Sequence, residues 1–98
     1  MKVVKVWDKD EYINVSEIES IEVIRNTIEF FDTVIYDIVI YVKNTNGDYH
    51  RPVYRATSKK DCYITLEVFL DMINDPNDER HPYKYIIDLE KMCTTNNE

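Results

Sequence analysis

The pattern of apolar residues is that of strands through much of the chain. The clearest strand is TVIYDIVIYVK, residues 33–43, whose two faces are both largely apolar, with Asp37 as its one acidic residue. A strand that is apolar on both faces is typical of the middle of a sheet, so we predict that this segment is a central strand. The stretches KVVKVW (2–7) and EYINV (11–15) predict two further strands, joined as a hairpin by the turn-forming DKD between them.

The stretch SEIESIEVIRN, which begins at Ser16, supports two interpretations. Ser16 and Glu19 have the spacing of a helix capping box. The β-branched residues that follow lower helix propensity. We therefore predict a tight turn or a single helical turn at 16–19, followed by a strand over about 20–31. Along 11–24 the acids alternate with isoleucine and valine, which is what a strand with one buried and one charged face requires.

An Asn-Gly pair at 46–47 predicts a hairpin turn, because both residues tolerate positive φ. The stretch DYHRPVYRA (48–56) is then the return strand. Pro52 cannot donate a ladder hydrogen bond, so this strand should lie at an edge or contain a bulge. Regular alternation places three of its residues on one face: Arg51, Val53 and Arg55.

The period changes to that of a helix in TSKKDCYITLEVFLDMIND (57–75). Ser58 and Asp61 have capping-box spacing, and Pro76 forces the chain out of the helix. Five apolar residues recur at helical spacing, and we expect them to pack on the sheet: Cys62, Leu66, Phe69, Leu70 and Ile73.

The C-terminal part is less regular. Residues 76–82 read as a polar loop, and 94–98 as a disordered tail. The stretch YKYIIDLEKM (83–92) fits both strand alternation and a helical repeat. Pro82 before it favours a strand, and the choice stays open.

These elements predict an α+β fold, with a small curled antiparallel sheet of about five strands and one amphipathic helix packed on it. A strongly curled sheet could also close in part, so a partly open barrel is the alternative architecture. The length of 98 residues fits a single domain, which we place at 1–93.

The formal net charge of −7 disfavours direct binding to nucleic acid, because phosphate contacts need Lys and Arg. Acidity fits a simple role in solubility, and it also fits a protein partner with a basic surface. Four basic residues gather near the predicted edge strand and helix start: Arg51, Arg55, Lys59 and Lys60. They indicate either an ordinary salt-bridged surface or a molecule whose charge is unevenly distributed.

The sequence offers little for catalysis or metal binding. His50 and His81 lie in no metal-binding spacing, and Cys62 and Cys93 form no Cys-x-x-Cys pair. DPNDER (75–80) lacks the glycine of a calcium loop. No phosphate-binding loop or nucleophile motif occurs, so we expect a non-enzymatic protein without cofactor or metal.

No apolar run is long enough to span a bilayer, and the first residues do not resemble a secretory signal. We therefore expect a cytoplasmic protein that makes no membrane contact. The segments YIN and IESIE within 11–24 resemble the start of a family of small bacterial flagellar proteins, and no residue role follows from this resemblance. In size, acidity and lack of motifs the chain also resembles phage-encoded inhibitors, including anti-CRISPR proteins.

We therefore predict a small acidic interaction domain, in its sharpest form an inhibitor from a phage or mobile element. It would bind a nucleic-acid-handling enzyme through an acidic face that imitates nucleic acid. The candidate binding residues are Glu17, Glu19, Glu22, Asp71, Asp75, Asp78 and Glu79. The alternative is a self-associating structural or regulatory subunit of a bacterial assembly, with a homodimer formed through the edge strand 48–56.

Overall fold

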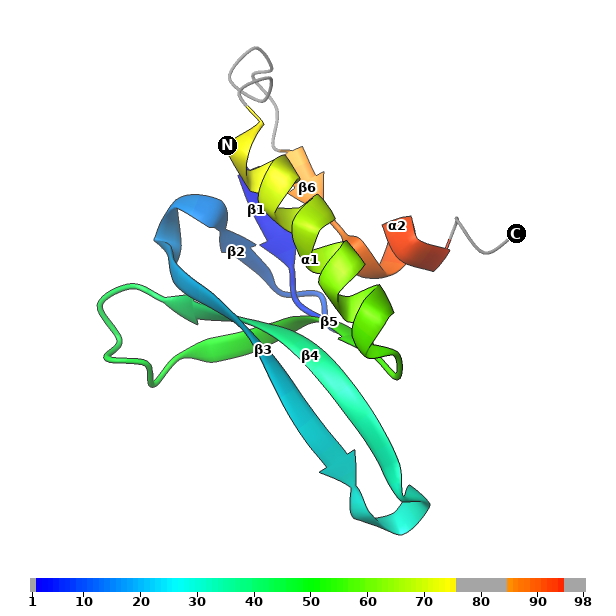
Figure 1. Ribbon diagram of the computed structural model, residues 1–98. Coiled ribbons are helices and arrows are strands. Elements are labelled where there is room, and N and C mark those ends of the chain that lie inside the picture. Colours follow the sequence, from blue (N-terminus) through cyan, green and yellow to red (C-terminus); the bar gives the residue numbers. More distant parts are fainter. Residues whose placement is uncertain (1, 76–84, 95–98) are drawn as a thin grey trace.

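The computed structural model describes residues 2–75 and 85–94. For residues 93 and 94 it describes the backbone alone. Its strands form two three-stranded sheets. The first has the order β2-β1-β6 and consists of β1 (Lys2–Lys5), β2 (Tyr12–Asn14) and β6 (Tyr85–Ile87). The second has the order β3-β4-β5 and consists of β3 (Ile18–Ile28), β4 (Thr33–Val42) and β5 (His50–Ala56). The helix α1 (Lys59–Asn74) runs from the end of β5 toward the start of β1, and α2 (Leu89–Thr94) follows β6 (Figure 1).

The α+β class is confirmed, and the sheet differs from the prediction in two ways. The strands divide between two sheets, and no closed barrel forms within the described residues. In addition, β6 pairs with β1 in parallel. The division arises at the 3₁₀ turn η1 (Val15–Glu17), which turns the chain out of the β1–β2 hairpin. The Asn14 side chain caps this turn by accepting a hydrogen bond from the Ser16 amide at 3.0 Å.

The second sheet has β4 in its centre and β5 at an edge, as the sequence predicts. Asn46 and Gly47 both have positive φ in the turn before β5. The ladder between β4 and β5 contains a bulge, because Ile38 opposes Tyr54 while Val39 opposes Pro52. Both expectations for Pro52 are therefore confirmed.

The bulge corrects the prediction that Arg51, Val53 and Arg55 share one face. Arg51 opposes Ile40 and Arg55 opposes Asp37, and residues three apart on β4 point to opposite faces of the sheet. The extra residue in β5 reverses the alternation between the two arginines.

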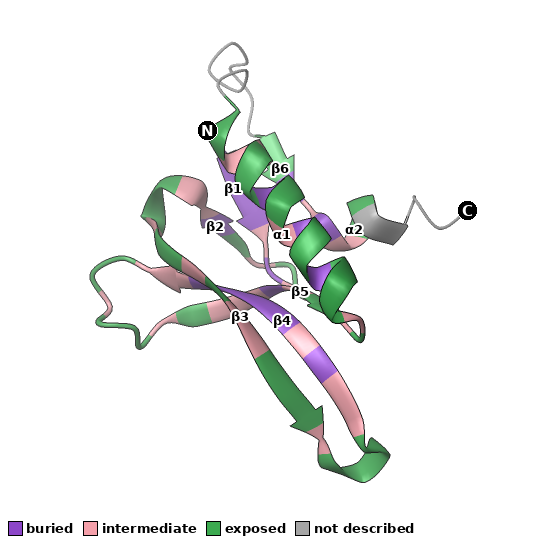
Figure 2. Cartoon of the chain, in the orientation of Figure 1, coloured by how far each residue is buried: buried purple, intermediate pink, exposed green. Residues whose placement is uncertain are grey.

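The core lies between α1 and the two sheets, where most buried residues gather (Figure 2). Ser58 caps α1 by accepting a hydrogen bond from the Asp61 amide at 3.2 Å. Cys62 and Phe69 are fully buried, and Leu66 and Ile73 pack against the core. The predicted stripe is wrong at Leu70, which is 39 % exposed, because the buried side of the helix is centred one position away and includes Thr65 instead.

The C-terminal end of α1 is held by Lys2, from the other end of the chain. The buried Lys2 ammonium donates hydrogen bonds to the carbonyl oxygens of Met72, Ile73 and Asp75. A cation at this end also interacts favourably with the helix dipole.

The described part of the ambiguous segment 83–92 contains both kinds of structure, because β6 is followed after one residue by α2. The loop predicted at 76–82 lies outside the described residues. Thr94, the first residue of the predicted tail, ends α2, and 95–98 are not described. Within the described ranges no helix is long and apolar enough to cross a membrane.

Candidate functional site

A groove of about 390 Å³ lies between the η1–β3 segment and the second half of α1. Its apolar lining comes from both sides: Val15, Ile18 and Ile21 on one, and Leu70 and Ile73 on the other. Glu19, Ser20 and Asn74 supply its polar lining. The groove therefore joins two segments that are about 50 residues apart in the sequence, and it explains why Leu70 is exposed.

A bulge at the start of β3 builds one wall of the groove. Ile18 opposes Val42, whereas Ser20 opposes Tyr41, so Glu19 is the extra residue. Because of this insertion Ile18 and Ile21 lie on the same face of the strand, although strict alternation would separate them. The adjacent η1 is tied to the end of β4 by a 2.8 Å hydrogen bond from the Lys43 amide to the Glu17 carbonyl.

The two elements that form this groove, η1–β3 and α1, also carry or adjoin four of the predicted acidic residues. Glu17 lies in η1 and Glu19 lines the groove from the bulge, and both side chains are exposed. On the other side, Asp71 follows Leu70 in α1, and Asp75 is the residue that ends the helix. Both aspartates are exposed. Glu19 is the acidic residue that lines the groove itself, and the other three belong to or adjoin the elements that form it.

Glu22, a fifth predicted residue, does not line the groove. Glu22 opposes Val39, on the face of the sheet turned away from Ile21. Its carboxylate accepts a 2.8 Å hydrogen bond from the Tyr41 hydroxyl, which raises the pKa of Tyr41. Asp78 and Glu79 lie outside the described residues.

Sequence reasoning missed Glu67, an exposed residue three positions before Leu70 and therefore on the same side of α1. The sequence signal that could have identified Glu67 is its spacing of four residues from Asp71, which places both acids on one side of a helix. The two carboxylates are thus about one helical turn apart.

Two of the four clustered basic residues are engaged in ion pairs within the chain. Arg51 Nε lies 3.1 Å from Glu11 Oε2, and Arg55 Nε lies 2.8 Å from Asp37 Oδ1. The Tyr49 hydroxyl also donates to Glu11. This hydrogen bond, with the charge of Arg51 as a smaller contribution, lowers the pKa of Glu11. The ordinary salt-bridged interpretation therefore holds for these two arginines.

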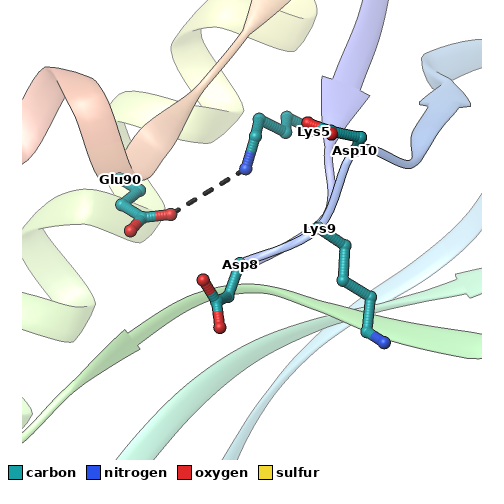
Figure 3. Close-up of a pocket in the computed structure, with 5 residues that line it drawn as sticks. All are labelled: Lys5, Asp8, Lys9, Asp10 and Glu90. Atoms are coloured by element: carbon teal, nitrogen blue, oxygen red, sulfur yellow. Dashed lines mark ion pairs between the residues drawn. The ribbon is translucent and has the colours of Figure 1, made fainter.

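A second pocket of about 270 Å³ lies between the β1–β2 turn and α2 (Figure 3). Its described lining is entirely charged: Lys5, Asp8, Lys9, Asp10 and Glu90. Lys5 Nζ lies 3.9 Å from Glu90 Oε2. Because charges of both signs line it and no apolar side chain does, this pocket offers a partner neither a uniform charge nor apolar surface to bury.

Cys62 is a free cysteine that is fully buried in the core. Burial, with the charge of Asp37 as a smaller contribution, raises the pKa of the Cys62 thiol to about 11. The thiol is therefore protonated at neutral pH, and only a thiolate is strongly nucleophilic. Within 2–75 and 85–94, no three His, Cys, Asp or Glu side chains converge as ligands for a metal ion.

No family model, curated protein or solved structure matches the chain.

Proposed function

We propose that this protein is a small non-enzymatic interaction domain that binds another protein through the acidic groove. The observation that carries the proposal is an apolar groove with Glu19 in its lining and further exposed carboxylates on both elements that form it, Glu17 in η1 and Asp71 in α1. Such a groove favours a segment that has apolar side chains on one face and Lys or Arg beside them. The apolar contact supplies affinity, and the charges supply orientation and a faster encounter.

The sharpest form of the proposal is an inhibitor that occupies the basic nucleic-acid channel of a nucleic-acid-handling enzyme. A net charge of −7 supports it, because a basic channel attracts an acidic protein over a long range. An anti-CRISPR protein of a phage or mobile element would act in this way, in the cytoplasm. No cofactor is required.

The test is a pull-down from host lysate, followed by affinity measurement on the purified protein that high salt releases. The double substitution Glu17→Gln and Glu19→Gln should weaken binding about fivefold at low salt, since exposed charge pairs contribute about 0.2–1 kcal/mol each. The control is Glu22→Gln, which removes one carboxylate from the other face of β3 and should leave affinity unchanged, whereas Glu19→Gln alone, the matched single substitution, should weaken binding. Displacement of the partner by duplex DNA would support the inhibitor form.

Three results would count against the proposal. They are equal affinity of the groove variant and wild type, equal losses in the variant and its control, and the absence of any salt-released protein.

The alternative function, a self-associating subunit, is favoured by one observation. Among the described residues β3 pairs only with β4, so its other edge is unpaired along 11 residues. The edge of β5, which the sequence suggests for a homodimer, is partly occupied, because Pro52 O accepts a 2.8 Å hydrogen bond from the Trp7 amide. Sedimentation velocity over a hundredfold range of concentration separates the two functions, since a concentration-dependent dimer would favour self-association.

A further inference from the structure

The hairpin of β3 and β4 extends beyond the rest of the second sheet. The ladder between β4 and β5 ends at the pair Tyr36–Ala56, so the distal part of the hairpin has no third strand. Figure 1 shows this part projecting away from α1 and the first sheet. At its tip, in the 3₁₀ turn η2 (Glu29–Phe31), Phe30 is 96 % exposed and Phe31 is 77 % exposed.

No other described apolar side chain is exposed to this degree, and the next, Ile86, is 54 % exposed. Two adjacent phenyl rings in water are unfavourable for an isolated protein, whereas aromatic side chains are common anchors in interfaces. The tip is thus a candidate binding element.

The turn that carries the rings has a defined geometry. Asp32 closes it in the left-handed conformation, with φ 46° and ψ 37°, which aspartate tolerates better than most residues. The Thr33 hydroxyl donates a 2.9 Å hydrogen bond to the Phe31 carbonyl oxygen. A turn that is already ordered loses less conformational entropy when its side chains enter a pocket.

The charges at the tip indicate what it binds. The exposed carboxylates of Glu29 and Asp32 flank the two rings, and the preceding basic residue is Arg25, on β3. These carboxylates repel an anionic lipid surface. They also repel a second copy of this chain, whose apolar groove has Glu19 in its lining. The complementary site is an apolar pocket with Lys or Arg at its rim.

We propose that Phe30 and Phe31 insert into such a pocket on the protein that also binds the acidic groove. The hairpin is then a second, apolar anchor separate from the groove. The inference rests on the proposed function in one respect, because it assigns both surfaces to the same partner.

The test places p-benzoylphenylalanine, a photo-crosslinking analogue of phenylalanine, at position 30 of the full chain in host lysate. The control places it at position 86, where Ile86 is 54 % exposed on β6, at the opposite edge of the first sheet from β2. Position 30 should crosslink the protein that high salt releases in the pull-down, and position 86 should not. With that purified protein as the probe, Phe30→Ser with Phe31→Ser should reduce affinity about thirtyfold or more. Ile86→Ser should change it less than twofold.

The outcomes separate failure of this inference from failure of the proposed function. A crosslink from position 30 to lipid, to a second copy or to a different protein would overturn the inference, and so would the absence of a crosslink. The loss caused by Glu17→Gln and Glu19→Gln would then still support the groove. If the wild type recovers no salt-released protein, the proposed function fails and the inference fails with it.

Discussion

The ion pair between Asp37 and Arg55 connects the central strand β4 with β5, and its two members differ in burial. Arg55 Nε and Nη2 donate to the two carboxylate oxygens of Asp37 at 2.8 and 3.0 Å. The Asp37 side chain is 7 % exposed, whereas that of Arg55 is 42 % exposed. We predict that Arg55→Leu destabilises the protein more than Asp37→Leu, although each removes the same pair.

The magnitudes follow from what each substitution leaves behind. Arg55→Leu leaves a carboxylate buried without its partner, which costs about 3–5 kcal/mol in a closed interior. Since the position of Arg55 is open to solvent, water can enter there, and we expect about 2–3 kcal/mol. Asp37→Leu keeps the number and branching of the side-chain heavy atoms and frees a guanidinium that can turn to water, so we expect about 1 kcal/mol or less. The double variant should stay within about 1 kcal/mol of wild type, which gives a coupling of about 2 kcal/mol.

The assay is urea denaturation of the four proteins at neutral pH, followed by circular dichroism and by Trp7 fluorescence. Coincident transitions and equal m values establish that all four unfold in two states. Equal costs for the two single variants, or a greater cost for Asp37→Leu, would refute the argument from unequal burial. A coupling energy near zero would show that the bidentate contact makes no net contribution to the free energy of unfolding.

Three further predictions concern the remaining contacts between elements. Lys2→Met should destabilise the protein by about 2 kcal/mol and speed amide exchange in the last turn of α1, because three carbonyls lose a charged donor; unchanged exchange would contradict the capping role. Glu11 has a lower pKa in the folded protein than its ordinary value of 4.5, so its contribution to stability is present above that pH and is lost as pH falls. Urea midpoints between pH 3 and 7 should therefore depend less on pH in Glu11→Gln, and parallel curves would exclude this linkage. Phe69→Ala should cost about 3–5 kcal/mol and Leu70→Ala less than about 1 kcal/mol; equal thermal denaturation midpoints would show that the helix presents a different face.

Local chemistry in the sequence was sufficient for most of the elements before residue 76, whereas the choice between strand and helix for 83–92 stayed open. Two largely apolar strand faces predicted β4 and its central place, and Ser58 predicted the start of α1. The Asn-Gly turn and the edge position of Pro52 were also correct. These features depend on residues a few positions apart, where backbone propensity and side-chain spacing act directly.

For the candidate site, the sequence supplied the acids and only the tertiary structure grouped them. Glu19 faces the end of α1 across the groove, while Glu22 lies on the other face of the sheet. One extra residue at the bulge of Glu19 decides this, and its position depends on how β3 aligns with β4. Alternation alone carries no signal for such an insertion, because register is set by packing across strands.

The same reason applies to the long-range contacts. The Lys2 cap on α1 and the division into two sheets join segments that are remote in sequence. Composition determined that the surface is acidic and that a core can form. Which acids share a surface, and which apolar side chains remain exposed at a hairpin tip, was decided by the way the strands and α1 pack together.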